Sequence, residues 1–392
     1  MFSSKKKETI PVEQMDLDAV MKKFDRESNT RVWEGKAKVV VNCILAAFSL
    51  FCIYVTFFAT WLDSIRLSSF MGAIVLIGFL VYPAKKGMQR ANYIPWYDLV
   101  LMLVGSGSFF FHTVTAMTII QQGNKFELHQ IIIGAIGILC LLELCRRCVG
   151  IPIIIVAGVF IVYAMGWGLT NPDMLRRLEG LVGKLFYTTT SGILSTPINT
   201  CSKFIAIFII FGAFLERTGI ADFFIQISNS VVGRFSGGPA KVAVVASAME
   251  GMVSGSSVAN TVGSGSVTIP LMKRTGYKPE FAAAAEASAS TGGQIMPPIM
   301  GAAAFLMAEN IGVAYSNIVV RAILPAILYF MGVFIAVHLE AKKEGLRGLS
   351  KEELPKFSPL LKQSYLLLPL IILIALVSSG SRSIAYAAAI AI

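Results

Sequence analysis

Residues 237–272 carry two apolar stretches, 239–253 and 258–271, separated by a run of serine and glycine. Each stretch has about 15 residues, whereas a helix needs about 20 to cross the hydrocarbon core of a bilayer. Both stretches are nevertheless too apolar and too close together for a soluble loop. We therefore predict a re-entrant helical hairpin over residues 237–272 that enters the membrane and returns, with its tip at residues 254–257 near mid-depth.

A second interrupted element follows at residues 279–311. It begins FAAAAEASAST and resumes as IMGAAAFLMAENI, and residues 292–298 between them contain two glycines and two prolines. Such a run does not sustain a continuous helix, so we predict a broken transmembrane helix with its break at mid-membrane. Non-helical backbone is tolerated there only where it is buried in protein or lines an aqueous cavity. Secondary transporters build ion and substrate sites from such helices, which makes both elements candidates for solute binding.

The composition supports an all-α polytopic membrane protein. Of the 392 residues, 55% are hydrophobic and 15% are charged, and the mean hydropathy is +0.70. A soluble domain has roughly a quarter charged residues. The net charge of +11 could indicate a nucleic-acid partner, but the basic residues cluster at the ends of apolar runs. That distribution is typical of anchoring at the cytoplasmic face of a lipid bilayer, so we expect no nucleic acid.

Hydropathy divides the chain into four parts. We expect a cytoplasmic basic segment at residues 1–38, a four-span region at 39–150, and a linking span with an extracytoplasmic amphipathic segment at 151–192. Residues 193–392 then hold the hairpin and the broken helix. The expected spans are 39–62, 67–83, 96–120, 130–144, 151–169 and 198–215, with two more inside 314–340 and 360–379, and a further helix starting near 383.

Basic residues predict the orientation of these spans. They are concentrated in residues 1–38 and after the second and fourth spans, whereas the alternate loops hold only Arg66 and Lys125. The N-terminus is therefore expected in the cytoplasm. One segment expected on the outer side is an exception to this bias, since it contains Arg176, Arg177 and Lys184. The spacing of its apolar residues indicates a helix lying along the outer surface.

The hairpin tip and the helix break offer neutral oxygen ligands, which suit a hard cation such as sodium. The predicted ion-binding residues are Ser254, Ser256, Ser257, Asn260, Ser290, Thr291, Gly292 and Gly293. No organic cofactor is expected, and no metal beyond sodium.

The same two elements also offer free backbone N–H groups, which attract anions where a helix begins. One such end is the start of the second hairpin limb, at Ser254, Gly255, Ser256 and Ser257. The other is the second half-helix, expected to start near Pro297 and Pro298. A carboxylate substrate is predicted there. Alternatively, the small residues only permit close helix packing, although this explains less well why a hairpin and a break occur in succession.

Acidic residues inside these elements are functional candidates because an ionisable group is costly in a membrane. Glu250 precedes the hairpin tip, and Glu286 lies four residues before Ser290 on one helical face. Each could be a proton site, a residue of the substrate path, or a buried group paired with a hydroxyl. Glu309 is expected at the outer interface, and the Gly-Ser run at residues 105–108 is interpreted as helix packing.

Several motifs give the chain a resemblance to a known family. They are FGAFLERTG, GGPAKVAVVASA, SGSSVAN, TIPLMKRTGYKPEFAAAAEA, STGGQIMPPIMGAAAF and RAILPAILYF. The chain resembles the fused permeases of TRAP (tripartite ATP-independent periplasmic) transporters, and most of all the TAXI-associated type, in which the small and large membrane subunits are one polypeptide. The resemblance is close over about residues 150–350 and looser before them, where four spans resemble the small subunit.

The resemblance implies a symporter of the bacterial or archaeal inner membrane, with a sodium or proton gradient driving uptake. It implies an extracytoplasmic TAXI-type solute-binding protein as partner and an elevator-like movement. The substrates implied are organic acids such as C4-dicarboxylates, 2-oxoacids or glutamate. By motif position, residues 254–257 and Asn260 correspond to the family's first hairpin tip. Residues 291–293 with Pro297 and Pro298 correspond to the break that completes the first ion site.

The chain departs from the family pattern because no second, inverted hairpin and broken helix follow the first pair. We therefore expect a fragment, or a gene truncated near residue 392. One alternative is an ion-coupled carboxylate carrier that works without a binding protein, against which the four extra N-terminal spans argue. An intramembrane serine hydrolase is disfavoured, because such an enzyme needs a base beside its nucleophile and His112, His129 and His338 lie far from the Ser-Gly run.

Overall fold

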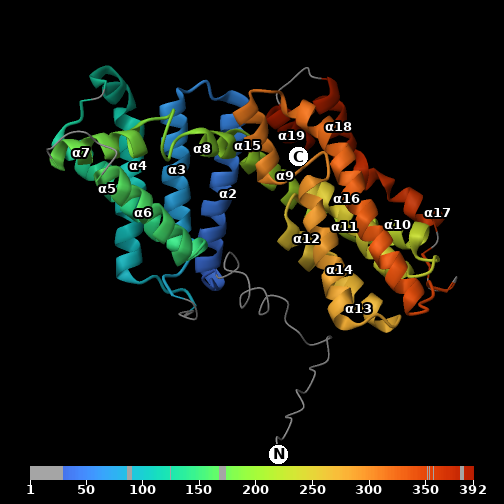
Figure 1. Ribbon diagram of the computed structural model, residues 1–392. Coiled ribbons are helices and arrows are strands. Elements are labelled where there is room, and N and C mark those ends of the chain that lie inside the picture. The colour runs from blue at the N-terminus through green and yellow to red at the C-terminus, as the bar shows by residue number, and fades with distance from the viewer. Residues whose placement is uncertain are drawn as a thin grey trace, which may run out of the picture. The chain divides into compact units, whose positions relative to one another are not determined.

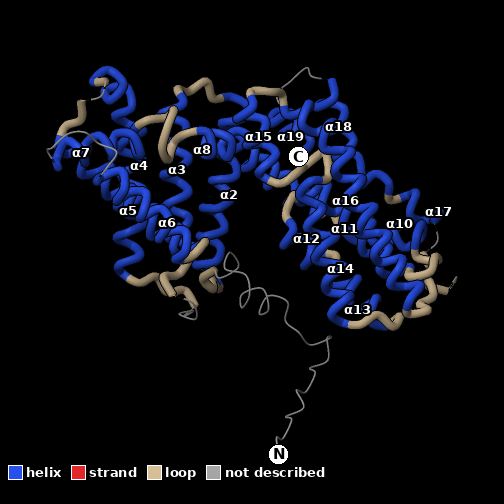
Figure 2. Tube along the Cα trace, in the orientation of Figure 1, coloured by secondary structure: helices blue, strands red, loops and turns tan. Residues whose placement is uncertain are grey.

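The computed structural model describes residues 30–85, 91–123, 125–166, 174–350, 352, 354–355, 357–379 and 384–392. Across these ranges all regular structure is helical and no strand is present (Figure 2). This confirms the predicted all-α class. Most of the predicted basic segment 1–38, together with Lys86, Arg90, Lys351 and Lys356, lies outside the described residues.

The chain divides into two compact units, Met1–Ser202 and Lys203–Ile392. The first unit contains α2 (Gly35–Phe58), α3 (Asp63–Val81), α4 (Trp96–Gln122), α5 (Leu128–Cys148), α6 (Ile151–Gly166), α7 (Met174–Val182), the π-helical turn η2 (Gly183–Tyr187) and α8 (Thr196–Thr200) (Figure 1). A second π-helical turn, η3 (Cys201–Ile205), continues α8 across the boundary.

The second unit contains α9 (Ala206–Arg217), α10 (Ile220–Val232), α11 (Gly238–Ser254), α12 (Ser257–Gly263), α13 (Gly265–Arg274), α14 (Pro279–Gly292), the 3-10 turn η4 (Gly293–Ile295), α15 (Ala302–Ile311), α16 (Tyr315–Lys343), α17 (Phe357–Lys362), the 3-10 turn η5 (Ser364–Leu367), α18 (Leu368–Ser379) and α19 (Ile384–Ala391) (Figure 1).

Among the described residues, six helices are long and apolar enough to cross a bilayer. They are α2 to α5, the composite helix Thr196–Arg217, and α16. The predicted fifth span, residues 151–169, corresponds to α6, whose described part has only 16 residues. The last predicted span corresponds to η5 and α18, which together are also shorter than a full span.

The segment predicted to lie along the outer surface is helical, as α7 and η2. Its apolar side contributes to the core of the first unit, where Val182, Phe186 and Tyr187 are buried. The hydroxyl of Tyr187 donates to the backbone oxygen of Gln130 on α5 at 2.7 Å. Packing on α5 therefore holds this segment, in addition to any contact with a membrane surface.

The Gly-Ser run in α4 is a packing site, as predicted. A Cβ atom on Gly105 would lie 2.9 Å from the Cβ of Cys140 and 3.0 Å from a methyl group of Val75. The hydroxyls of Ser106 and Ser108 donate to backbone oxygens one turn earlier in α4, at 2.6 and 2.8 Å. Glycine thus lets α3, α4 and α5 approach closely, and the serine hydroxyls are satisfied within their own helix.

The hairpin of the second unit follows from local chemistry. α11 ends at Ser254 because Gly255 adopts a left-handed conformation, φ +59°, which glycine accepts without strain. Ser256 then caps α12, its Oγ accepting from the backbone N–H of Ala259 at 3.3 Å. The second limb continues from α12 into α13 through Ser264. Two helical limbs thus meet at the predicted tip, and the depth of this tip in a membrane stays a prediction.

Alanines bring the hairpin and α14 together. Ala240, Ala243, Ala282 and Ala289 are fully buried in one cluster with residues of α11, α13, α14 and α16. Small side chains let helix backbones approach each other closely. The packing interpretation of the small residues therefore holds for these positions, and both limbs of the hairpin lie beside α14 (Figure 1).

Candidate functional site

The hairpin and the broken helix meet backbone to backbone at two glycines. A Cβ atom on Gly251 of α11 would overlap the Cα of Gly293 at the break. A Cβ on Gly293 would lie 2.8 Å from the Cα of Gly251 and 2.9 Å from Nδ2 of Asn260. At the tip, a Cβ on Gly255 would lie 3.0 Å from the backbone oxygen of Met300. Any side chain at these positions would force the two interrupted elements apart.

The tip serines lie at this junction and are partly exposed. The Oγ of Ser257 accepts from Nε2 of Gln294, in the break, at 3.0 Å. The Oγ of Ser254 accepts from the backbone N–H of Ser256 at 3.5 Å, and Ser256 itself caps α12. A hydroxyl of the tip therefore bonds a side chain of the break, and the predicted ion site stays a prediction.

The second half-helix begins later than predicted. It starts at Ala302, with Gly301 as its cap, instead of near Pro297 and Pro298. Residues 296–301 form a non-helical connection. Tyr315, further along the sequence, stabilises it: its hydroxyl donates to the backbone oxygen of Pro298 at 3.0 Å and accepts from the N–H of Met300 at 3.3 Å. The free N–H groups of the half-helix therefore follow Gly301, and the two prolines offer no N–H group to an anion.

A buried polar cluster joins the two hairpin limbs to α14. The carboxylate of Glu286, fully buried, receives four hydroxyl groups. Its Oε1 accepts from Ser247 at 2.9 Å, Ser264 at 2.5 Å and Ser290 at 3.1 Å, and its Oε2 accepts from Thr268 at 2.5 Å. The pair Glu286 and Ser290 was predicted from its spacing, whereas the hydroxyls of the hairpin limbs were not.

The remaining predicted ligands are divided between this cluster and the surface. Asn260 is fully buried, and its Nδ2 donates to the backbone oxygen of Ser247 at 2.8 Å. Ser290 faces Glu286 and not the break. Thr291 is exposed, and its hydroxyl donates to the backbone oxygen of Ala287 at 2.7 Å. Gly292 and Gly293 are buried at the junction. The structure therefore brings Ser257, Gly293 and the side-chain amide of Asn260 to the junction, whereas Ser290 bonds Glu286 in the cluster.

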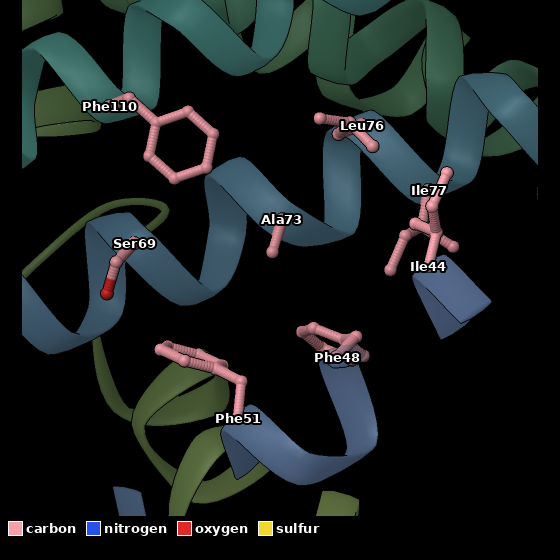
Figure 3. A pocket seen from close by; sticks show the side chains of 8 residues that line it. All are labelled: Ile44, Phe48, Phe51, Ser69, Ala73, Leu76, Ile77 and Phe110. Carbon is pink, nitrogen blue, oxygen red and sulfur yellow. The ribbon is translucent and has the colours of Figure 1, made fainter. Parts of the chain in front are cut away.

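Two cavities elsewhere are unsuited to a carboxylate. One, about 270 Å³, lies between α2, α3 and α4 and is lined by apolar side chains and Ser69 (Figure 3). The hydroxyl of Ser69 donates to the backbone oxygen of Ile65 at 2.7 Å, so the cavity offers an anion no free donor. The other, about 420 Å³, lies beside α11 and α16 and has only apolar side chains in its lining, among them Met249, Met296 and Phe334.

A buried ionic cluster in the first unit escaped the sequence analysis. Asp98, at the start of α4, pairs with Arg31 through one oxygen and with Nη2 of Arg147 through the other, at 2.7 Å. Arg147 also pairs with Glu143 at 2.9 Å, and its guanidinium lies 4.8 Å from the ring centre of Phe79. A carboxylate inside a predicted span is the sequence signal that could have identified this cluster.

Residues 136–392 match the family described as "Tripartite ATP-independent periplasmic transporter, DctM component". Similar curated proteins include the C4-dicarboxylate TRAP transporter large permease proteins DctM of Vibrio cholerae and Pseudomonas aeruginosa. The first is 29% identical over 214 residues (54% of this chain, 44% of the relative), and the second is 28% identical over 224 residues (57% and 49%). The sialic acid TRAP transporter permease protein SiaT of Haemophilus influenzae is 24% identical over 224 residues (55% and 35%). The matched relatives are thus covered over half of their length or less.

Proposed function

The chain belongs to the DctM component family of tripartite ATP-independent periplasmic transporters, and we propose that it acts as the membrane permease component of a binding-protein-dependent secondary transporter. In this role it carries organic acids inward, driven by an ion gradient, with sodium as the coupling ion. The protein is a transporter component and not an enzyme.

The observation that supports this proposal is the contact of two interrupted helices at Gly251 and Gly293. A helix break leaves backbone groups without their intrahelical partners, and a membrane tolerates such groups only in a protein-lined site. The hydroxyl of Ser257, at the tip, bonds the side chain of Gln294 in the break. The junction therefore combines neutral oxygens for a cation with free amides for the anionic end of an organic acid.

For the cation, the proposed ligands are the tip hydroxyls, above all Ser257, and the backbone oxygens at Gly292 and Gly293. For the solute, we propose the amides that open α12 at the tip and those that follow Gly301. The substrate class proposed is a small carboxylate. Relatives named for C4-dicarboxylate and for sialic acid transport are consistent with this class, since both solutes are organic acids.

The proposed setting is a bacterial or archaeal inner membrane, with the N-terminus in the cytoplasm and a TAXI-type solute-binding protein on the outer side. The four helices α2 to α5 take the part of the small permease subunit in one polypeptide. The hairpin and the broken helix move together, in an elevator-like step, relative to a stationary part.

Sodium binding can be tested on the purified chain. We expect sodium chloride to raise the unfolding temperature more than choline chloride at the same ionic strength, since a bound ligand at 100 times its Kd stabilises by about 2.7 kcal/mol. Ser257→Ala should weaken this effect. Ser266→Ala, a control at an exposed hydroxyl of the same limb, should retain it. Equal stabilisation by both salts, or an unchanged sodium effect in Ser257→Ala, would contradict the proposed ion site.

The dependence on a binding protein needs a separate measurement. Uptake of a labelled carboxylate into proteoliposomes is expected only when the binding protein and an inward sodium gradient are both supplied. Uptake with the gradient alone would identify a carrier that works without a partner, and would refute the proposed tripartite arrangement.

A further inference from the structure

The hairpin buries two glutamates, and their surroundings differ. Glu286 accepts hydrogen bonds at both oxygens from the hydroxyls described above. Glu250, on α11, is only 5% exposed, and within the described part of the chain its Oε2 has no hydrogen-bond partner. Among these described residues, the hydroxyl of Ser264 is the one hydrogen-bonding side chain that favours a charge on Glu250. A buried carboxylate with an unpartnered oxygen is destabilised when it is charged. The two acids therefore cannot be equivalent.

The charged groups that act on the carboxyl of Glu250 are all negative. Across the described residues they are the carboxylates of Glu286 on α14, Glu216 on α9 and Asp222 on α10. Glu286 is fully buried, whereas Glu216 and Asp222 are exposed, so solvent screens their repulsion. No base is among these groups. The electrostatic environment thus adds to the cost of a negative charge on Glu250.

Basic groups on the elements packed against α11 are not among the charges that act on Glu250. On α9 the basic group is Arg217, which is exposed in the last turn of that helix. Lys241 precedes Glu250 by nine residues on the same helix, which is about 13 Å along its axis, and its ammonium lies over the rings of Phe235 and Phe334. The basic groups of α16 include Lys342, which acts on Lys241 and not on Glu250. On α13 the basic residues are the two at its C-terminal end, and α12 and η4 carry no charged residue.

We propose that Glu250 is a proton-binding site of the hairpin, occupied by a proton at neutral pH in this conformation. The proton comes from water and forms an O–H bond at Oε2. This inference deepens the proposed function, on which it rests, by adding the proton to sodium as an ion bound by the same hairpin.

Gly263 supplies the route by which the carboxyl can meet solvent. It lies on the second limb and is exposed, and a Cβ atom at this position would overlap Oε1 of Glu250. The carboxyl therefore lies directly behind a residue without a side chain, and a small movement of the limbs uncovers it. A proton bound there would exchange when the hairpin shifts.

Infrared spectroscopy of the purified full chain tests the site directly. At neutral pH we expect the carbonyl stretching band of a protonated carboxylic acid, shifted in heavy water. The band should be lost in Glu250→Gln and retained in Glu286→Gln and in the exposed control Glu309→Gln. Absence of the band from the wild type, or its persistence in Glu250→Gln, would overturn the proposal.

The pH dependence of the unfolding free energy gives a second test, which uses the wild type and therefore does not depend only on how a variant folds. At neutral pH Glu250 holds a proton in the folded state, whereas in the unfolded chain the same residue is exposed and has released it. The folded state therefore binds one proton more, so the free energy of unfolding of the wild type should fall as pH rises from mildly acidic to mildly alkaline values. Glu250→Gln, which imitates the protonated acid, should show a smaller fall. Equal falls would count against the site. The infrared band tests the proton site at Glu250, and the sodium effect on the unfolding temperature tests the proposed ion site. Either result can be negative while the other is positive, so the two proposals can fail separately.

Discussion

Replacing Gly251 by alanine tests whether the hairpin and the broken helix depend on backbone contact. The new Cβ would overlap the Cα of Gly293, which is backbone and cannot swing aside as a side chain can. Either α11 or the break must shift. The matched control is Gly332→Ala in α16, where a Cβ would meet nothing within 4 Å.

The expected magnitude comes from two opposing terms. Alanine is favoured over glycine in a helix interior by about 1 kcal/mol, and this term is common to both variants. Overpacking a close contact costs typically about 1–3 kcal/mol, and this term applies to Gly251→Ala alone. We expect Gly332→Ala to be neutral or stabilised, and Gly251→Ala to be less stable than it by about 1–3 kcal/mol.

Thermal unfolding in one detergent, followed by circular dichroism, measures this difference. For a domain of 150 to 250 residues, each kcal/mol shifts the unfolding temperature by roughly 2–4 °C, so the variants should differ by about 2–12 °C. Equal unfolding temperatures for Gly251→Ala and Gly332→Ala would refute the close contact and with it the junction on which the proposed site depends.

Two further substitutions test contacts that hold each unit together. Asp98→Asn leaves Arg31 without its buried counter-charge and should cost about 3–5 kcal/mol in unfolding free energy, measured by denaturant titration. The control Asp63→Asn, in an exposed pair, should cost at most about 1 kcal/mol. Similar losses for the two variants would disprove the buried cluster. Tyr315→Phe removes the hydroxyl that bonds the backbone of residues 298 and 300, and should lower stability by about 1–3 kcal/mol in the same titration, with the exposed Tyr54→Phe as a control that should change little.

The ends of the helices at the hairpin tip could be predicted from the sequence alone, because they depend on the backbone conformations that single residues prefer. The hairpin tip was predicted at residues 254–257, and α11 ends at Ser254 while α12 begins at Ser257. Both ends depend on adjacent residues: a glycine that accepts a left-handed conformation and a serine that caps the next helix. The end of α14 at Gly292 follows in the same way from two glycines in succession.

The start of the second half-helix could not be predicted in this way. Prolines commonly occupy the first turn of a helix, which favoured Pro297 as its beginning. Helix α15 instead begins at Ala302, because the hydroxyl of Tyr315, well beyond the break in the sequence, bonds the backbone at Pro298 and Met300. A contact between distant residues overrides the local preference here.

Local patterns were sufficient to predict the set of interrupted helices, because length, apolar runs, and the positions of glycine, serine and proline act within a few neighbouring residues. The three-dimensional packing, in contrast, sets which polar groups meet. Ser247 and Thr268 face Glu286, while Glu250, on the same hairpin, is left with an unpartnered oxygen within the described structure. These contacts differ because the rotation and depth of each limb depend on how its alanines pack against α14, and no local pattern encodes that fit.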